Sequence, residues 1–341
     1  MIQMKWNIKR IINFSEDKRW ENGYCHFGFH DDEGNQYRLD NDNDWIGLLE
    51  KNDEFRWTAG CIDPELSKNH ISCEIRRPTY LARYHNENSL IVTSHGTNKI
   101  IKLYPKEQRA EILIDGNKEG IKNIGNCEFD IYKNIWINEI TGCRIWMFNS
   151  QGRKKLVLGD GIPGFQKNTT QFETARFNWI YDLRKGFDGN IYVLDSKNYS
   201  IRKINPKTKT VETIIGIGSP GYTGDGEQAK KATLGGKENQ EFDGPWSLSL
   251  DEFGNTYIGD TQNHVVRMVE RHTGIISTIA GNPEIKEKWR NSITETNPLR
   301  LNLPRICSME YHQGNLYIPD WDGDLIILSK CTEKNFNTMS K

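Results

Sequence analysis

The sequence lacks long apolar runs and lacks an excess of charge of either sign. No apolar stretch approaches the 18 residues that a membrane-spanning helix requires, so no such helix is expected. The 45 lysines and arginines nearly balance the 46 aspartates and glutamates, which leaves a formal net charge of −1. Because no long run of one sign occurs, neither nucleic acid nor a membrane surface is expected as the main partner.

Paired cysteines and a secretion signal are also missing. The seven cysteines are an odd number, lie far apart and include no C-x-x-C pair. This pattern favours reduced thiols over a disulfide or zinc framework. Near the N-terminus, Lys5, Lys9 and Arg10 interrupt what would be the apolar core of a signal peptide. We therefore expect a cytoplasmic protein.

A repeated phrase is the main feature that the sequence does contain. A turn that ends in Gly-Asn or a near variant is followed by an aromatic or β-branched strand, and this phrase occurs six times. Between the first and last copies the mean spacing is about 56 residues, which is typical of a repeat architecture. The equivalent positions are Asn35, Ser89, Asn134, Asn190, Asn255 and Asn315.

Each repeat predicts about four short strands. The second strand ends in an acid or a small polar residue, and a tight polar turn follows, as in 195–198 and 260–263. Two further strands of four to six residues complete the unit, and no 10-residue amphipathic helix separates them, which argues against parallel βαβ units. Six such units predict an all-β, six-bladed β-propeller with four-stranded antiparallel blades.

The ends of the chain predict how the ring closes. The last unit has three clear strands, and the N-terminal strand within residues 4–14 would supply the fourth. We therefore expect a single propeller domain over residues 1–330, with its last blade completed by that N-terminal strand. Residues 331–341 are expected to form a polar C-terminal tail.

Two segments carry a resemblance to a known family. Phe187–Gly216 and Phe253–Gly281 resemble NHL repeats, with Gly-Asn, an aromatic strand, Asp, Asn followed by Tyr or His, a basic strand and a Thr-Ile-containing end. The resemblance implies a six-bladed propeller. It leaves function open, because similar propellers include scaffolds, sugar-lactone hydrolases, amidating lyases and ligand-binding modules.

One motif resembles a dinucleotide-binding fingerprint. Residues 216–221 read GIGSPG, a G-x-G-x-x-G after a β-branched run. A second copy of the pattern lies one repeat earlier, at 159–164, and the expected helix meets Gly235 and Gly236 after a few residues. The sequence therefore predicts a crossover between blades, where glycine allows the sharp change of direction.

Metal sites are a weaker possibility. The acid-rich turns at 40–44 and 320–324 have the oxygen donors that Ca²⁺ prefers, but Cys331 stands where a calcium loop would place its bidentate glutamate. A zinc site would need histidines from different blades to meet at the axis, and of the eight histidines His26 alone is expected at an inner-strand start. Ca²⁺ or Zn²⁺ is the one cofactor left open, and the turns are predicted to be structural.

The mouth of the central channel is the predicted ligand site. Aromatic faces there would stack on a ligand and an arginine would clamp a carboxylate, although the tryptophans would equally serve as packing between blades. Glu128 and Asp182, slightly further along the inner strands, are the predicted acid or base. The residues expected at the strand starts are His26, Thr79, Asn126, Trp179, Trp246 and Arg305.

Two classes of function follow. The first is a propeller that binds a small molecule or a protein partner at the channel mouth. The alternative is a metal-dependent hydrolase or lyase, similar to lactonases or amidating lyases, with His26, Glu128 and Asp182 as catalytic groups. A further alternative is a metal-free condensing enzyme similar to strictosidine synthase, with Glu128 or Asp182 as the base. Whether the protein is an enzyme stays open.

Overall fold

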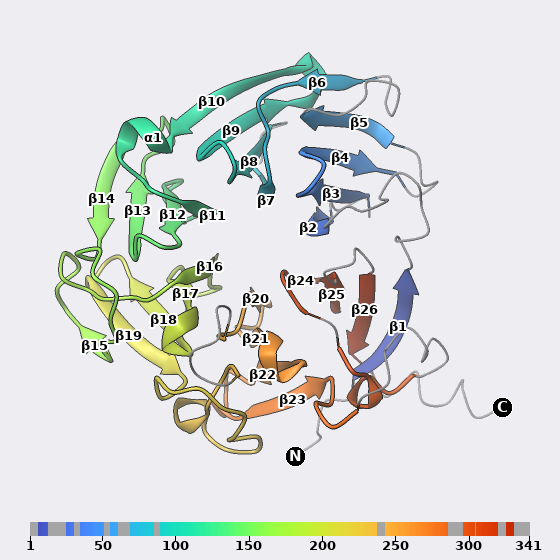
Figure 1. The fold of residues 1–341 in the computed structure, drawn as a ribbon, viewed down its shortest axis with the longest axis vertical. Helices are drawn as coiled ribbons and strands as arrows, with labels where there is room; N and C mark the ends of the chain where they lie inside the picture. Colours follow the sequence, from blue (N-terminus) through green and yellow to red (C-terminus); the bar gives the residue numbers. More distant parts are fainter. Residues whose placement is uncertain are drawn as a thin grey trace.

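The computed structural model shows six antiparallel sheets arranged as blades around an axis (Figure 1). It describes residues 6–12, 25–30, 35–50, 55–60, 69–84, 89–236, 243–285, 296–303, 305–319 and 325–330, and of these the side chains of 11–12 and 25–30 are left undescribed. The second acid-rich turn, at 320–324, and the tail, at 331–341, lie outside the described residues. The predicted six-bladed propeller is confirmed.

The first three blades follow one another along the chain, each starting with its innermost strand. Blade 1 contains β2 (Cys25–His30), β3 (Gln36–Asp40), β4 (Trp45–Leu49), β5 (Phe55–Gly60) and the short β6 (His70–Ser72). Blade 2 contains β7 (Pro78–Arg83), β8 (Leu90–Ser94), β9 (Lys99–Tyr104) and β10 (Arg109–Asp115). Blade 3 contains β11 (Ile124–Phe129), β12 (Ile135–Glu139), β13 (Arg144–Phe148) and β14 (Lys154–Leu158).

The remaining blades repeat the pattern. Blade 4 contains β16 (Ile180–Lys185), β17 (Ile191–Asp195), β18 (Ser200–Asn205), β19 (Thr210–Ile215) and the two-residue β15 (Asn168–Thr169) at its outer edge. Blade 5 contains β20 (Ser247–Leu250), β21 (Thr256–Asp260), β22 (Val265–Val269) and β23 (Ile276–Ala280). Blade 6 contains β24 (Glu310–His312), β25 (Asn315–Pro319), β26 (Leu325–Lys330) and β1 (Trp6–Ile12). Blades 1 and 4 thus carry one short strand beyond the four expected.

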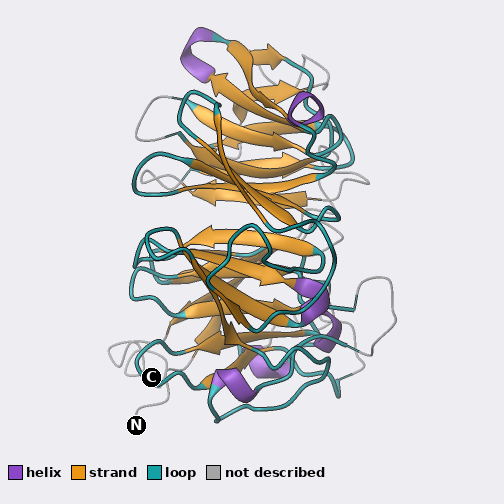
Figure 2. Ribbon diagram, turned by 90° about the vertical axis from the view of Figure 1, so that its left-hand side faces the viewer, coloured by secondary structure: helices purple, strands orange, loops and turns teal. Residues whose placement is uncertain are grey.

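Helical segments are short. They are α1 (Gly116–Glu119), η3 (Pro105–Glu107), η4 (Ser196–Asn198), η5 (Ala229–Lys231), η6 (Thr261–Asn263) and η8 (Pro298–Arg300). Across the residues that the structure describes, no helix has the length and apolarity needed to traverse a bilayer. Figure 2 shows the strands running across the thickness of the ring, from one face to the other.

The N-terminal strand completes the last blade, as predicted. β1 pairs antiparallel with β26 from Trp6 opposite Lys330 to Ile12 opposite Leu325, so the two ends of the described chain share one sheet (Figure 1). Trp6 is 5% exposed, and its ring meets that of Tyr257 edge-on at 5.7 Å. The first strand is therefore joined to its own blade by hydrogen bonds and to blade 5 by packing.

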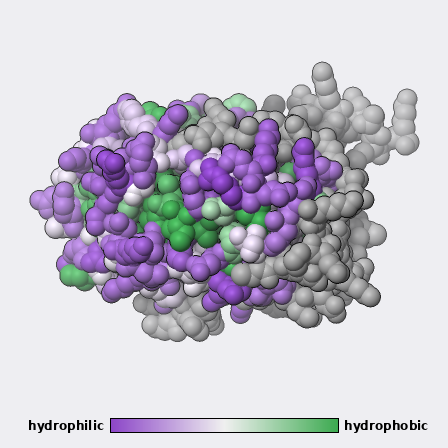
Figure 3. Space-filling view, turned by 90° about the horizontal axis from the view of Figure 1, so that it is seen from above, coloured by the Kyte–Doolittle hydropathy of each residue, from purple (hydrophilic) through white to green (hydrophobic). Residues whose placement is uncertain are grey.

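The hydrophobic core lies between successive blades and does not form one central cluster. Strands such as β17 and β22 are buried at every position because each face of a sheet packs on a neighbouring sheet. One cluster joins Trp136 and Ile145 of blade 3 to Leu183 and Val193 of blade 4. At the outer rim, β10 runs across the top of Figure 1, and Figure 3 shows hydrophobic residues gathered on the face seen from there; Ile112 in β10 is 51% exposed.

The glycine-rich stretch is a crossover between β19 and β20, as predicted. Gly216, Gly218 and Gly221 all have positive φ angles, of 89°, 90° and 147°, and the only helical turn between β19 and β20 in the described residues is the three-residue η5. The buried Arg267 donates to the carbonyl oxygens of Thr223 and Thr233, which fixes the loop on blade 5. The glycines thus shape a backbone path and do not open a nucleotide-binding helix.

Two faces of the ring are distinguished below. The entry face is the one where the inner strands begin, and it carries the crossovers. The hairpin face is the opposite one, where the inner strands end and turn into the second strands, as at 130–134 and 186–190.

Candidate functional site

Strand register places residues from several inner strands at one height along the axis. Each of these residues pairs with the residue just before the last position of the neighbouring second strand: Tyr80 with Thr93, Asp182 with Leu194, Ser247 with Gly259 and His26 with Leu39. Asn126 lies at the same height, although a bulge interrupts the pairing of β11 with β12 there. Its backbone N–H donates to the side-chain oxygen of Asn138, the residue just before the last position of β12, at 2.6 Å. We call these five residues the first ring.

Asp182 connects three blades. Its Oδ1 accepts a hydrogen bond from the amide of Asn126 in blade 3 at 2.6 Å, and its Oδ2 accepts from the backbone N–H of Leu248 in blade 5 at 3.1 Å. The guanidinium of Arg184, two residues along β16, donates to the same Oδ2 at 3.2 Å. Asp182 is 2% exposed, and burial raises its pKa although these donors oppose the shift. Both oxygens are therefore engaged in holding the inner strands together.

A second ring lies two residues further along the inner strands. Its members pair with the aromatic residue that follows each Asn landmark of the repeat: Glu128 with Trp136, Arg184 with Tyr192, Ser249 with Tyr257 and Glu310 with Tyr317. Glu128 was among the predicted residues and Arg184 was not. The signal for Arg184 was present in the sequence, because counting back from the aromatic landmark across the first hairpin leads to it.

Arg184 reaches across the axis. Its Nε donates to the carbonyl oxygen of Leu248 at 3.0 Å, and its guanidinium carbon lies 5.3 Å from the ring centroid of Tyr80, two blades away. Burial lowers the pKa of Arg184, but the charge of Asp182, together with Tyr80 and the charge of Glu128, outweighs it and holds that pKa above its ordinary value. Among the described residues, Nη1 of Arg184 has no hydrogen-bond partner.

Glu128 faces Arg184 from the neighbouring blade without an ion pair in the described residues. Its Oε1 accepts from the backbone N–H of Phe129 at 2.8 Å, which fixes the carboxylate, and Oε2 has no hydrogen-bond partner in the described part of the chain. The two charges still influence each other, since Glu128 contributes to the raised pKa of Arg184. The arrangement leaves one acceptor and one donor of opposite charge open near the axis.

The other predicted residues lie near the entry face. The hydroxyl of Thr79 donates to the carbonyl oxygen of Gly125 at 2.6 Å, which ties blade 2 to blade 3. Trp246 is 3% exposed and stacks on Tyr181, with centroids 5.6 Å apart and planes 14° apart, so it fills the space between blades. Trp179 has a left-handed backbone conformation, and the ammonium of Lys197 lies over its ring, 5.0 Å from the ring centroid.

Arg305 and His26 complete the predicted set. Arg305 is exposed, and its carbonyl oxygen accepts from the thiol of Cys307. His26 pairs through its backbone in β2, and its side chain lies outside the described residues. Of the predicted side chains, the structure thus brings Asn126 and Asp182 into direct contact.

The first acid-rich turn is held by hydrogen bonds. Asp40 accepts from the backbone N–H and the amide of Asn43 at 2.8 and 3.0 Å, and Asp44 accepts from Arg76 and from the backbone N–H of Arg77, both at 2.7 Å. Within the described ranges, no group of three or more histidine, cysteine, aspartate or glutamate side chains is placed to hold a metal ion. Binding of Ca²⁺ or Zn²⁺, considered from the sequence, is therefore tested by the metal analysis described below.

Curated relatives match this chain over short stretches. The protein SUPPRESSOR OF QUENCHING 1, chloroplastic, of Arabidopsis thaliana is 34% identical over 92 residues, which is 27% of this chain and 8% of that protein. NHL repeat-containing protein 2 of Gallus gallus is 28% identical over 118 residues, 34% of this chain and 15% of that protein. The chain thus matches less than a sixth of the length of either relative. No protein-family model matches the sequence.

Solved structures match the fold over nearly the whole chain. The match to a protein of unknown function from Bacteroides thetaiotaomicron covers 96% of this chain and 77% of that protein's chain, with a TM-score of 0.69 and 14% identity. An auxiliary nutrient binding protein from Bacteroides ovatus covers 97% of this chain and 78% of its own, with a TM-score of 0.66 and 12% identity. Virginiamycin B lyase from Staphylococcus aureus covers 96% of this chain and 99% of its own, with a TM-score of 0.57 and 8% identity.

Structural similarity at sequence identities this low shows that the fold is shared, but it does not transfer an activity. The sequence relatives add the repeat type, because their name carries the same repeat that Phe187–Gly216 and Phe253–Gly281 resemble. Together with the six blades, these matches support an NHL-repeat β-propeller.

Proposed function

We propose that this propeller binds a small polar ligand on its axis, between Glu128 and Arg184. The observation that carries the proposal is the open pair of charges: Oε2 of Glu128 and Nη1 of Arg184 have no hydrogen-bond partner among the described residues. A molecule that offers a donor to the carboxylate and an acceptor to the guanidinium would satisfy both. Zwitterionic amino acids and primary amides have this chemistry.

The surroundings support recognition by preorganised groups. Asp182 and the carbonyl oxygen of Leu248 hold the guanidinium in place, and Asp182 is itself fixed by Asn126 and by the N–H of Leu248. The N–H of Phe129 holds the carboxylate of Glu128. Groups that are already fixed lose little conformational freedom when a ligand binds. Because Asp182 is committed to three donors, Glu128 is the acid that remains for a ligand.

Thermal-shift measurements followed by calorimetry test the proposal on the full-length chain. A panel of neutral amino acids and small primary amides should stabilise the protein, and Glu128→Gln should weaken binding by about tenfold or more, since it removes a charged hydrogen bond. Glu173→Gln, at an exposed position in the crossover before blade 4, is the matched control and should bind like the parent. If no compound in the panel binds, or if Glu128→Gln binds equally well, the axial site is wrong.

The enzymatic alternatives differ in what they require. A hydrolase or lyase would need a metal ion near the axis, with His26, Glu128 or Asp182 among its ligands, and the condensing alternative would need an acid free to act as a base. Metal analysis of the purified protein, with a thermal-shift screen of Ca²⁺ and Zn²⁺, separates the metal-dependent enzyme from the binding protein and from the metal-free condensing enzyme. A stoichiometric metal would favour the enzyme over the binding protein proposed here.

A further inference from the structure

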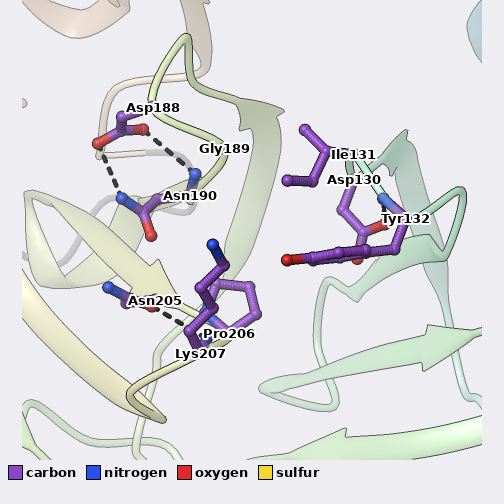
Figure 4. Close-up of a pocket in the computed structure, with 9 residues that line it drawn as sticks. All are labelled: Asp130, Ile131, Tyr132, Asp188, Gly189, Asn190, Asn205, Pro206 and Lys207. Carbon is purple, nitrogen blue, oxygen red and sulfur yellow. Dashed lines mark hydrogen bonds between the residues drawn. The ribbon is translucent and has the colours of Figure 1, made fainter.

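A cavity of about 110 Å³ opens between blades 3 and 4, apart from the axis. Three turns line it: residues 130–132 after β11, residues 188–190 after β16, and residues 205–207 between β18 and β19 (Figure 4). All three turns belong to the hairpin face. None of the site residues predicted from the sequence lies among them.

The apolar wall of the cavity is held rigidly. Asp130 accepts from the backbone N–H groups of Tyr132 and Asn134 at 2.8 and 2.9 Å, from the amide of Asn134 at 2.8 Å and from the indole of Trp136 at 3.0 Å. This network fixes the turn that presents Ile131 and Tyr132, which are 61% and 60% exposed. Ile131 and Tyr132 therefore form a fixed apolar wall that a ligand in the cavity would cover.

Lys207 is the cation among the residues that line the cavity. The oxygens of the two acids in the wall are occupied: Asp130 keeps its charge but accepts from the four neutral donors above, and the charge of Asp188 is balanced by the ammonium of Lys203 at 2.8 Å, beside the backbone and amide N–H groups of Asn190. The side chain of Lys207 has no ion pair among the described residues, while its backbone N–H is fixed by Asn205 at 2.9 Å. Figure 4 shows Lys207 and the ring of Tyr132 directed into the space between the two blades, while the amide of Asn190 turns toward Asp188.

We propose that this cavity binds a carboxylate carried next to an apolar side chain. The ammonium of Lys207 pairs with the carboxylate, and Ile131, Tyr132 and the ring of Pro206 cover the apolar group. At about 110 Å³ the cavity is smaller than one of about 150 Å³ that accepts benzene, so its volume suits a branched aliphatic group. The rest of the ligand extends into solvent, so the source is either a free organic acid or the C-terminus of a peptide.

Four probes separate these two sources: N-acetyl-leucine, its amide, a tetrapeptide that ends in leucine, and the same peptide as a C-terminal amide. Binding to the full-length protein is measured by calorimetry. At least one acid should bind, and its amide should bind about tenfold more weakly or not at all, because the ion pair with Lys207 is lost. If N-acetyl-leucine and the peptide bind alike, the site recognises a free organic acid. If the peptide alone binds, the site recognises the C-terminus of a peptide.

Two variants and one control complete the test. Lys207→Gln should abolish the preference for the acid over the amide, and Tyr132→Ala should weaken both. Lys230→Gln, an exposed substitution of the same type in η5, should behave like the parent. Equal binding of acid and amide, an unchanged preference in Lys207→Gln, or no binding by any probe up to its solubility overturns the proposal. Since Lys207 and Tyr132 are not part of the axial site, failure here leaves the axial proposal standing.

Discussion

At the scale of single residues, two buried aspartate–arginine pairs stand out. Asp195 and Arg202 in blade 4 are both fully buried, with 2.9 Å between Oδ2 and Nη1, and Asp260 lies 3.9 Å from Arg267 at the same place in blade 5. Both arginines donate to carbonyl oxygens of the crossover that precedes their own blade, Arg202 to Gln166 and Arg267 to Thr233. Burial raises the pKa of Asp195 and of Asp260 to about 6, although the arginines and the neighbouring amides oppose it.

These pKa shifts predict an unusual pH dependence. In the unfolded chain Asp195 loses its proton near the ordinary pKa, while in the folded protein it keeps the proton until about pH 6. The folded state therefore binds more protons between these values, and the contribution of Asp195 to the free energy of unfolding falls as the pH rises from about 4 to 6. Urea unfolding of the parent and of Asp195→Asn at several pH values should show their difference growing as the pH falls through this window.

Asp251 provides a control of opposite sign. Burial raises its pKa, but hydrogen bonds from Asn255 and the ammonium of Lys330 outweigh that effect and hold the pKa below its ordinary value. Its stabilising contribution is present above the unfolded pKa and is lost as the pH falls through the folded one. The difference between the parent and Asp251→Asn should therefore shrink on acidification. The same trend in both variants would contradict the assignment.

At the scale of elements, the crossover before blade 5 is shaped mainly by backbone contacts. Gly221 and Gly235 accept hydrogen bonds through their carbonyl oxygens from the amide of Asn263, at 3.0 and 2.9 Å. The N–H of Gly216 donates to the carbonyl oxygen of Ala229 at 3.0 Å, so the start of the crossover is fixed as well. A segment without long strands or helices is thus held in one conformation by the turn residues of the blade it enters.

The prediction for this element uses two glycines with similar backbone angles. Gly216 has φ of 89° and Gly226 has φ of 83°, but a Cβ at Gly216 would lie 2.3 Å from the carbonyl oxygen of Tyr199, while a Cβ at Gly226 would meet nothing within 4 Å. Gly226→Ala should cost about 1 kcal/mol from the left-handed backbone alone. Gly216→Ala should cost about 3 kcal/mol or more because the clash adds to it. Equal unfolding midpoints for the two variants would show that the close contact relaxes freely.

At the scale of the whole molecule, the ring depends on contacts between neighbouring blades. Every large hydrophobic cluster in the described residues except that of Tyr317, Leu325 and Ile327 joins side chains from different blades. The pairing of β1 with β26 makes the first and last described strands part of one sheet. Stability of repeat proteins of this kind arises largely from interfaces between adjacent units.

Deletion of residues 1–14 tests this closure. The loss removes β1 and the buried Trp6, and it exposes the edge of β26, so the free energy of unfolding should fall by several kcal/mol. Denaturant unfolding measures the effect, with size-exclusion chromatography to detect association through the new edge. A second variant that lacks residues 1–5 keeps β1 and should be affected much less. A mild effect of the longer deletion would count against closure by this strand.

Local sequence signals were sufficient for the repeat, the number of blades and the closing strand. Strand alternation and turn residues such as the Asp-x-x-Asn at 195–198 act over a few residues, so they can be read without knowing the fold. The G-x-G-x-x-G pattern occurs twice, at the same place in two successive repeats. A motif that recurs with the repeat serves the repeated structure, so it identified the crossover between blades. Asn126, Glu128 and Asp182 were placed at the axis by the same counting.

Which further side chains join these three around the axis, and at which height, was decided by the tertiary structure. Bulges in the inner strands, between Pro78 and Tyr80 and between Ile180 and Asp182, shift the register by one residue. In a strand such a shift turns side chains to the opposite face, so Tyr80 joins the first ring in place of Thr79, and Asp182 in place of Tyr181. Likewise, Lys207 and Tyr132 lie 75 residues apart in the sequence and share one cavity because neighbouring blades bring their turns together.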